Sequence, residues 1–366
     1  MNSAPNPFAG DFKEIRRVLV RTANWIGDAV MTFPALASIR EGLPNRHIAV
    51  LTKPWVADLF SGHPLINEVL VYESPGIHEG IRGKWKLARE LKKKQFDLAI
   101  LFQNAFEAAL IAFWAGIPRR AGYNTDARGI LLTQAVPVNG KVKKGHQVDY
   151  YRAMTGGLGF QSHPSAPSIG LTRSQLEESE RILSSHGLQG EKLLIGLAPG
   201  ATYGPAKQWF PERFSALADR FSRDWGARIL IFGSQGDRDP ASLLTKSART
   251  EVTDFTGQTT LSQGIGLIAR CCLFVSNDSG LMHVAAALGV PVVAIFGSTD
   301  PVRTRPLGRN CRVVRQPLPC APCLKTHCPE RRECLERITV DEVYEAARGL
   351  WEEAGRHRSE REPIFP

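Results

Sequence analysis

The 366-residue chain has no run of apolar residues long enough to cross a membrane. A membrane-spanning helix needs about 20 consecutive apolar residues, and no uninterrupted stretch approaches that length. The first fifteen residues also lack a basic segment followed by an apolar core, so no secretory signal is visible. We therefore expect a cytoplasmic protein.

Several common catalytic motifs are absent as well. Neither half carries GxGxxG after its first expected strand or a GxxxxGK[ST] loop, and no GxSxG or HExxH occurs. The sequence therefore contains no motif that would indicate a dinucleotide-dependent dehydrogenase or a P-loop enzyme. No helix-turn-helix, zinc-finger or aromatic RNA-binding signature is present, so we expect no nucleic-acid partner.

What is present is the composition of a globular protein with an excess of positive charge. The chain is 43% hydrophobic and 22% charged, and 46 Lys and Arg against 36 Asp and Glu give a formal charge of +10. Such an excess favours a polyanionic partner, for which anionic lipid and phosphorylated substrates both qualify. A basic surface that only aids solubility is the simpler alternative.

Alternating strand and helix patterns fill both halves of the chain. Arg17 to Arg21 reads as a strand, Ala29 to Glu41 as a helix and His47 to Thr52 as the next strand, and strands resume at Leu193 after a linker at 161–168. This order predicts parallel α/β sheets. We expect an N-terminal domain over 1–170, a C-terminal domain over 171–339, a helix near 340–356 that could pack back on the first domain, and a tail over 357–366.

Residues 272–297 contain the clearest potential site. They read as a buried strand, a polar turn at Ser276 to Gly280, a short apolar helix and a second buried strand. Asp278 and Ser279 could cap the helix. Because backbone N–H groups and the positive end of a helix dipole attract anions at the carboxyl end of a strand, we interpret this turn as a diphosphate cradle.

Three other residues have both a structural and a chemical interpretation. Asp28 ends the loop after the first strand, where it could cap a helix, compensate its dipole or act as a general base. Lys207 lies in a Gly/Pro-rich loop and could be a plain surface lysine or neutralise a diphosphate. His283, in the first turn of the 281–288 helix, could be a buried structural histidine or a phosphate contact.

Basic residues gather in two parts of the first half. The expected helix at 83–94 carries six Lys and Arg, among them Lys84 and Lys86, against the single acid Glu90. Arg119 and Arg120 follow in a loop. Mixed charges would solubilise a helix equally well, so the bias in sign favours an anionic ligand.

Four of the seven cysteines lie close together near the C-terminus. Cys320, Cys323, Cys328 and Cys334 have the spacing C-x2-C-x4-C-x5-C, which could enclose one zinc ion or an iron–sulfur cluster. The longer gap between two CxxC pairs that is typical of a zinc ribbon is missing. Free thiols are therefore the alternative.

Several long segments resemble the lipopolysaccharide heptosyltransferases of glycosyltransferase family 9, and the type II enzymes most. They are Trp25 to Asp28, Ala105 to Pro118, Pro199 to Trp209, Phe232 to Ser234 and Ser276 to Gly289. The resemblance extends from about Arg16 to Tyr344. It implies a GT-B fold with two Rossmann-like domains facing a central cleft, the donor bound mainly by the C-terminal domain and the acceptor by the N-terminal one.

The resemblance also implies the reaction and the roles of particular residues. Such enzymes transfer heptose from ADP-L-glycero-β-D-manno-heptose, with inversion and without a required cofactor or divalent metal, to the inner core of lipopolysaccharide. The likeness to the type II enzymes implies addition of the second heptose. The acceptor, Kdo and heptose on lipid A, would bring the protein into peripheral contact with the inner face of the inner membrane. Asp28 matches the base, the donor residues are Thr202, Lys207, Asp278, Ser279, Gly280 and His283, and the acceptor contacts are Lys84, Lys86, Arg119, Arg120 and Arg128.

Two alternatives remain open at this point. A related family enzyme with another inner-core acceptor or heptose donor would share the same donor loop. A non-catalytic module that binds polyanions would share the basic surface but would release no nucleotide.

Overall fold

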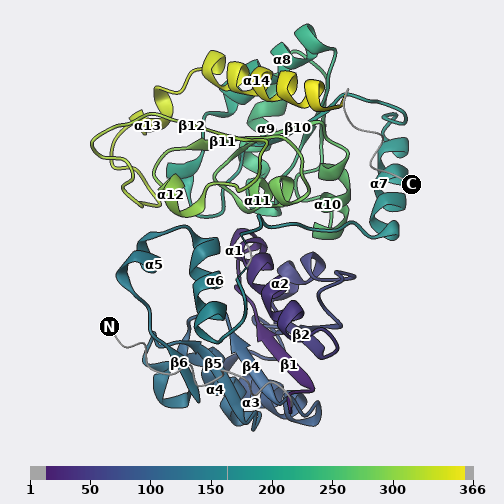
Figure 1. Ribbon diagram of the computed structural model, residues 1–366. Helices are drawn as coiled ribbons and strands as arrows, with labels where there is room; N and C mark the ends of the chain where they lie inside the picture. The colour runs from purple at the N-terminus through teal and green to yellow at the C-terminus, as the bar shows by residue number, and fades with distance from the viewer. Residues whose placement is uncertain (1–13, 163, 359–366) are drawn as a thin grey trace. The chain divides into compact units, whose positions relative to one another are not determined.

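The computed structural model describes residues 14–162 and 164–358 (Figure 1). Contacts between Cα atoms divide the chain into two compact units, Met1–Gly170 and Leu171–Pro366. Each unit is built around one parallel sheet, so each is described by itself. No helix in the described ranges is both long enough and apolar enough to span a membrane.

The first unit contains a parallel sheet of six described strands. Their order across the sheet is β3-β2-β1-β4-β5-β6. The central strands are buried along almost their whole length, as expected of strands covered on both faces. The strands are β1 (Arg17–Arg21), β2 (His47–Thr52), β3 (Glu68–Val71), β4 (Leu98–Leu101), β5 (Arg119–Tyr123) and β6 (Gln134–Val136).

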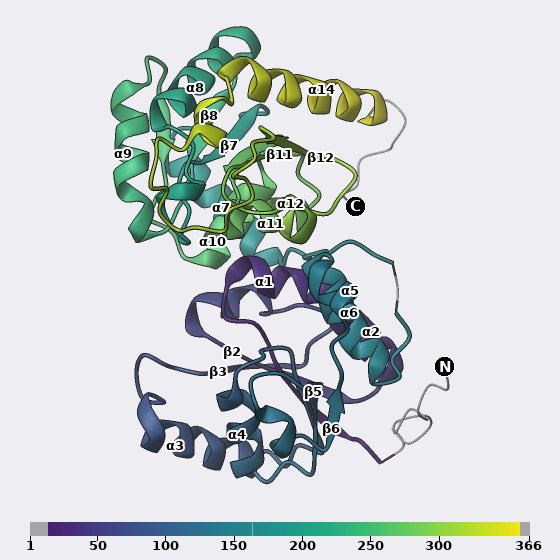
Figure 2. The same ribbon diagram turned by 90° about the vertical axis from the view of Figure 1, so that its left-hand side faces the viewer.

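Helices cover both faces of this first sheet (Figures 1 and 2). Apolar residues of α3 and α4 share one core with the strands, and α2 and α6 pack against each other. The helical elements are α1 (Ile26–Met31), α2 (Phe33–Gly42), η1 (Pro54–Leu59), α3 (Gly80–Lys93), α4 (Phe106–Trp114), η2 (Arg128–Leu131), α5 (Gly140–Lys144) and α6 (Gln147–Gly157).

The second unit repeats this topology. Its strand order is β12-β11-β10-β7-β8-β9, and all of these neighbours are parallel. The strands are β7 (Leu194–Ala198), β8 (Arg228–Ile231), β9 (Val252–Asp254), β10 (Leu273–Asn277), β11 (Val292–Phe296) and β12 (Cys311–Arg315).

Helices α8, α9 and α14 share a core with this second sheet, and α7 packs on α10 (Figure 2). The helix expected to return to the first domain is α14, which packs on strands β10, β11 and β12 of the second unit. From residue 359 onward, the expected tail lies outside the described residues. The helical elements are α7 (Arg173–Ser185), η3 (Pro205–Lys207), α8 (Pro211–Trp225), η4 (Gln235–Asp237), α9 (Arg238–Ser247), α10 (Leu261–Ala269), α11 (Gly280–Ala287), α12 (Pro301–Thr304), α13 (Glu333–Glu336) and α14 (Val340–Arg358).

Both sheets have a switch point between two neighbouring strands. On one side of this point the strands follow one another in chain order in one direction across the sheet, and on the other side in the opposite direction. In the first unit the switch point lies between β1 and β4, and in the second between β7 and β10. Doubly wound sheets bind ligands at the carboxyl ends of these strands. The loop after β1 leads into α1, which carries Asp28, and the loop after β7 carries Lys207, so the topology places both candidate residues near such an edge.

Candidate functional site

A buried ion pair lies at the switch point of the second unit. The Nζ atom of Lys207 is 2.7 Å from Oδ2 of Asp278, and the two side chains are only 13% and 5% exposed. The same ammonium group lies 4.8 Å from the centroid of the Tyr203 ring. Lysine and aspartate are 71 positions apart in the chain. The fold therefore holds a cation in a defined position at the carboxyl edge of the sheet.

The side chains of the turn at residues 276–280 form hydrogen bonds within the second unit. Asp278 also accepts a hydrogen bond of 2.6 Å from Thr299 Oγ1, and the Ser279 hydroxyl lies 2.9 Å from that of Ser276. Ser279 is the N-cap residue of α11, but no side chain caps this helix. This corrects the expectation that Asp278 and Ser279 cap it. Since the first N–H groups of a helix have no partner within the helix, they can bind an anion here.

The loop that carries the lysine, residues 199–209 and here called the lysine loop, is tied to β10 by one asparagine. Asn277 Nδ2 donates to the Pro199 carbonyl over 2.7 Å, and Asn277 Oδ1 accepts from the Trp209 amide over 2.9 Å. Trp209 is fully buried. A single side chain thus joins both ends of the lysine loop to the strand that leads into the 276–280 turn.

The remaining predicted donor residues lie in these same elements. Thr202 is exposed in the lysine loop, and Gly280 is the first residue of α11. His283 lies in the first turn of α11 and is buried. The structure therefore brings Lys207, Asp278, Ser279 and Gly280 to one edge of the second sheet, with Thr202 and His283 in adjoining turns.

Asp28 lies in the first turn of α1 and is half-buried. Trp25 is the N-cap residue, so Asp28 does not cap the helix, although its charge favours the helix dipole. Burial raises the pKa of Tyr151, and the negative charge of Asp28 raises it further. Asp28 therefore lies within electrostatic reach of a buried phenol of α6.

A group of cations lies at the carboxyl edge of the first sheet, and two of its members, Arg21 and Lys53, were not predicted from the sequence. We call Arg21, Lys53 and Lys84 the cationic cluster. Arg21 ends β1, is 2% exposed, and donates to Asn24 Oδ1 over 2.6 Å. Lys53, 7% exposed, follows β2, and its Nζ lies 3.8 Å from the centroid of the Tyr72 ring. The cluster thus borders the loop that leads to Asp28.

One nearby carboxylate compensates part of this charge. Glu107 accepts from Lys84 Nζ and from the Tyr72 hydroxyl, both over 2.6 Å. Burial alone would raise the pKa of Glu107, but these two hydrogen bonds lower it. Burial lowers the pKa of Lys53, and the charge of Arg21 lowers it further. Adjacent cations disfavour each other's charged form, and a bound anion relieves this repulsion. The cluster is therefore suited to bind an anion.

The predicted acceptor residues do not all lie together. Lys84 belongs to the cationic cluster, whereas Lys86 is exposed on α3. Arg119 and Arg120 begin β5, at the amino end of the strand and away from its carboxyl edge. Arg120 donates to the Leu131 and Ile117 carbonyls.

Arg128 is fully buried. Its guanidinium donates to the carbonyls of Tyr123 and Gln103 and to Asn104 Oδ1. Burial lowers the pKa of Arg128 to about 10. This arginine therefore braces the loop after β4.

The four clustered cysteines are not arranged as metal ligands. Cys320 is exposed, Cys323 and Cys328 are partly buried, and Cys334 is buried. Burial raises the pKa of Cys334, and the nearby thiols raise it further. No three His, Cys, Asp or Glu side chains within residues 14–162 and 164–358 are placed to hold one metal ion. The spacing of the four cysteines allowed a zinc or iron–sulfur site. In the described structure their thiols are not placed as such a site requires.

Comparisons with known proteins identify the family of the chain. Residues 84–333 match the family model of glycosyltransferase family 9 (heptosyltransferase). The chain is 34% identical over 307 residues to lipopolysaccharide heptosyltransferase 2 of Escherichia coli, covering 82% of this chain and 88% of that protein.

Two solved structures are similar along almost their whole length. The structure of E. coli ADP-heptose lipopolysaccharide heptosyltransferase II aligns with a TM-score of 0.79 and 28% identity, covering 93% of this chain and 99% of that one. A family 9 glycosyltransferase from Veillonella parvula aligns with a TM-score of 0.82 and 26% identity, covering 92% and 98%. The expected two-domain α/β fold is thereby confirmed.

Proposed function

The chain belongs to glycosyltransferase family 9, the heptosyltransferases, and we propose that it transfers heptose from ADP-L-glycero-β-D-manno-heptose to the inner core of lipopolysaccharide. The second heptose of the core is the proposed addition. The first unit would bind the acceptor, and the second unit would bind the donor.

The observation that carries this proposal is the Lys207–Asp278 pair beside the uncapped N-terminus of α11. An ADP leaving group develops negative charge on its β-phosphate as the bond to the sugar breaks. A fixed ammonium group and the first amides of a helix are suited to that charge. In this proposal Ser279 and Gly280 bind the diphosphate through their backbone, and Thr202 and His283 are further donor contacts.

The proposed transfer inverts the configuration at the anomeric carbon in one displacement. The carboxylate of Asp28 takes the proton of an acceptor hydroxyl, and the hydroxyl oxygen forms a bond to C1 of the heptose. The bond between C1 and the phosphate oxygen breaks on the opposite face, and its electron pair leaves with ADP. Asp278 keeps the Lys207 ammonium in position throughout.

No cofactor has a role in this proposal, because Lys207 and the α11 amides meet the charge of the leaving group. A structural zinc ion or iron–sulfur cluster at Cys320, Cys323, Cys328 and Cys334 would require the segment to rearrange. Elemental analysis of protein purified without chelator tests this possibility. A stoichiometry near zero would remove it.

Acceptor binding is assigned to the cationic cluster in the first unit. The inner core carries the carboxylates of Kdo, and buried cations bind such groups strongly because little water competes for them. Of the acceptor residues inferred from the resemblance, Lys84 is part of this cluster. We also propose acceptor-binding roles for Lys86, Arg119, Arg120 and Arg128. Of these, Arg128 would act by bracing the loop after β4.

Replacing Lys53 by methionine is expected to raise the KM for the acceptor about 10-fold, since a charge-assisted hydrogen bond contributes about 1.5–3 kcal/mol. The methionine keeps the packing of the aliphatic stem. The KM for ADP-heptose should stay unchanged. Steady-state kinetics with each substrate varied in turn measure both constants.

The matched control is Lys141→Met, which removes an exposed lysine of the same unit. It should change neither constant. An unchanged acceptor KM in the Lys53 variant would contradict the assignment of this subsite.

We assign the outer face of α3 to the membrane that carries the acceptor. Ile81 and Trp85 are 63% and 53% exposed there, and Ile77 just before the helix is 52% exposed. Arg89 lies 4.7 Å from the Trp85 ring, and further exposed cations are Arg82, Lys86, Lys92 and Lys93. Apolar and aromatic side chains among basic ones are typical of helices that lie at an anionic lipid surface.

The double variant Ile81→Ser/Trp85→Ser is expected to reduce binding to vesicles containing phosphatidylglycerol about 10-fold or more, measured by co-sedimentation. The reason is the loss of apolar area buried in the interface. Leu243→Ser, which alters a 48% exposed leucine of the second unit, is the control. Wild-type binding that does not depend on anionic lipid would contradict this assignment.

Product analysis tests the proposed reaction itself. Incubation with ADP-heptose and an acceptor that already carries one heptose should add one heptose residue, detected by mass spectrometry. Addition only to an acceptor without heptose, or only from another heptose donor, would favour a related family enzyme. Salt-sensitive binding of unrelated polyanions without nucleotide release would favour a binding module.

A further inference from the structure

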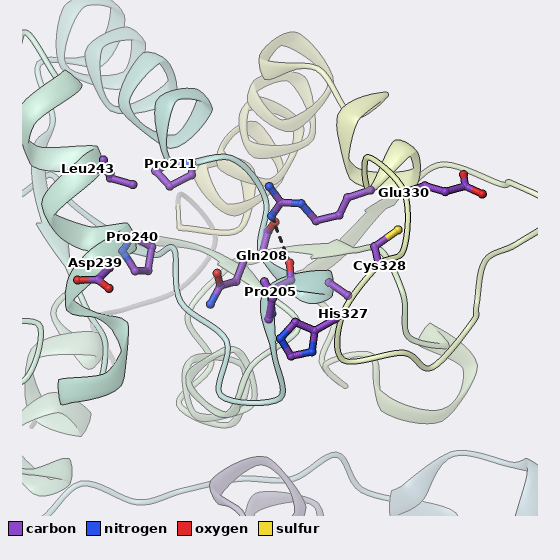
Figure 3. A pocket seen from close by; sticks show the side chains of 11 residues that line it. Pro205, Gln208, Pro211, Asp239, Pro240, Leu243, His327, Cys328 and Glu330 are labelled. Atoms are coloured by element: carbon purple, nitrogen blue, oxygen red, sulfur yellow. Dashed lines mark hydrogen bonds between the residues drawn. The ribbon is translucent and has the colours of Figure 1, made fainter.

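The four-cysteine segment, residues 320–334, lies against the lysine loop. Figure 3 shows Pro205 and Gln208 of the lysine loop beside His327 and Cys328 of this segment, around one pocket. We call residues 320–334 the cysteine segment. The reaction proposed above gives it no role, so its contacts with the lysine loop need an explanation.

Two backbone positions of the cysteine segment hold the first part of the lysine loop. The Tyr203 hydroxyl donates to the Leu324 carbonyl over 2.7 Å, and the Ala206 amide donates to the Thr326 carbonyl over 3.0 Å. Gly204 lies so close to the segment that a Cβ atom there would be 2.5 Å from the Thr326 carbonyl oxygen. The lysine loop and the segment therefore pack backbone against backbone.

Arg332 holds the second part of the lysine loop. Its Nη1 atom donates to the Gln208 carbonyl over 2.9 Å and to the Pro205 carbonyl over 3.2 Å. These two acceptors lie on either side of Lys207 in the chain. The guanidinium also lies 4.6 Å from the Phe210 ring. One arginine thus spans the short 3-10 turn that presents the lysine.

The cysteine segment also reaches the partner of the lysine. The Leu324 amide donates to the Ser298 carbonyl over 2.7 Å, and the next residue, Thr299, donates to Asp278. Both members of the Lys207–Asp278 pair are therefore held from the same segment. Because a displacement of about 1 Å can reduce catalysis about 100-fold, control of this geometry matters for the reaction.

We propose that the cysteine segment is a brace for the donor site and that Arg332 is a positioning residue for Lys207. The inference rests on the proposed donor role of Lys207. The brace acts through the backbone of the lysine loop, not through contact with the donor. Cys334, the buried thiol of the segment, has its pKa raised by burial.

The test is a double-mutant cycle between Arg332 and Lys207, with ADP binding measured by calorimetry and the KM for ADP-heptose by kinetics. Arg332→Met, which keeps the stem, is expected to weaken ADP binding and raise the donor KM about 10-fold, with the acceptor KM unchanged. In a Lys207→Met background the same substitution should have almost no further effect. Arg332→Lys should restore part of the loss.

Arg337→Met is the matched control, because Arg337 follows the cysteine segment, pairs with Glu333 of that segment and has no hydrogen bond to the lysine loop among its described contacts. It should leave ADP binding unchanged. If Arg332→Met does not fold, Tyr203→Phe removes the Leu324 hydrogen bond and should weaken ADP binding in the same Lys207-dependent way.

The outcomes separate the brace from the proposed function. Equal effects of Arg332→Met with and without Lys207 would overturn the brace, as would normal ADP binding by this variant. If wild-type protein binds no ADP at all, the proposed function fails and the brace fails with it. If Lys207→Met weakens ADP binding and Arg332→Met does not, the function stands and only the brace is wrong.

Discussion

Asp28→Ala should retain ADP-heptose binding and lose transfer by about 1,000-fold, within the 10²- to 10⁴-fold range of general bases. The carboxylate lies in the first turn of α1, at the carboxyl edge of β1, and its charge is felt by the buried Tyr151. The acceptor hydroxyl would keep its proton in the variant, so the displacement would begin from a weaker nucleophile. Binding of the donor needs none of these atoms.

Asp28→Asn sharpens this test because it keeps the size and polarity of the side chain and removes the charge. The asparagine should be nearly as inactive as the alanine. Asp149→Asn is the matched control, since Asp149 also lies in the first turn of a helix and forms an exposed ion pair with Arg152. Turnover of Asp28→Asn within a few-fold of wild type would show that Asp28 is not the base.

Lys207→Met should lower kcat/KM for ADP-heptose about 100- to 1,000-fold. This is the loss expected when one hydrogen-bond donor that stabilises a developing negative charge is removed. The substitution should also weaken ADP binding. Lys246→Met, which alters an exposed lysine of α9 in the same unit, should do neither. Kinetics and calorimetry measure the two effects separately.

Lys207→Met should also destabilise the protein, because it leaves the almost fully buried Asp278 carboxylate without its cation. This loss of stability must be separated from the loss of activity. Breaking a buried ion pair on one side costs about 3–5 kcal/mol. The double variant Lys207→Met/Asp278→Asn removes both charges and should recover most of the thermal stability but none of the activity. Activity that recovers together with stability would mean that the lysine only maintains the fold.

Much of the fold could be predicted because strands and helices leave local patterns. The run from Leu273 to Val275 is apolar, and Gly289 and Pro291 end the helix that follows. The structure has β10 at Leu273–Asn277 and α11 at Gly280–Ala287, within about two residues of the prediction. Loops at the carboxyl ends of these strands followed from the same patterns.

The partners of individual side chains could not be predicted in this way. Lys207 and Asp278 were both singled out, but their pairing depends on the order of β7 and β10 in the sheet. Arg128 looks like a surface arginine in sequence, yet it donates to the Gln103 carbonyl and the Asn104 side chain, 25 and 24 positions away in the chain. The sequence contains no signal for Lys53, since the Tyr72 ring and the charge of Arg21 come close to it only in the folded protein.

The measurement that tests the account most directly is ADP release by wild-type protein supplied with ADP-heptose, in the presence and absence of a heptosylated Kdo–lipid A acceptor. We expect release that requires the acceptor and is abolished by Asp28→Asn. Absence of acceptor-dependent release with every inner-core acceptor, or equal release by the Asp28→Asn variant, would contradict the proposed heptose transfer.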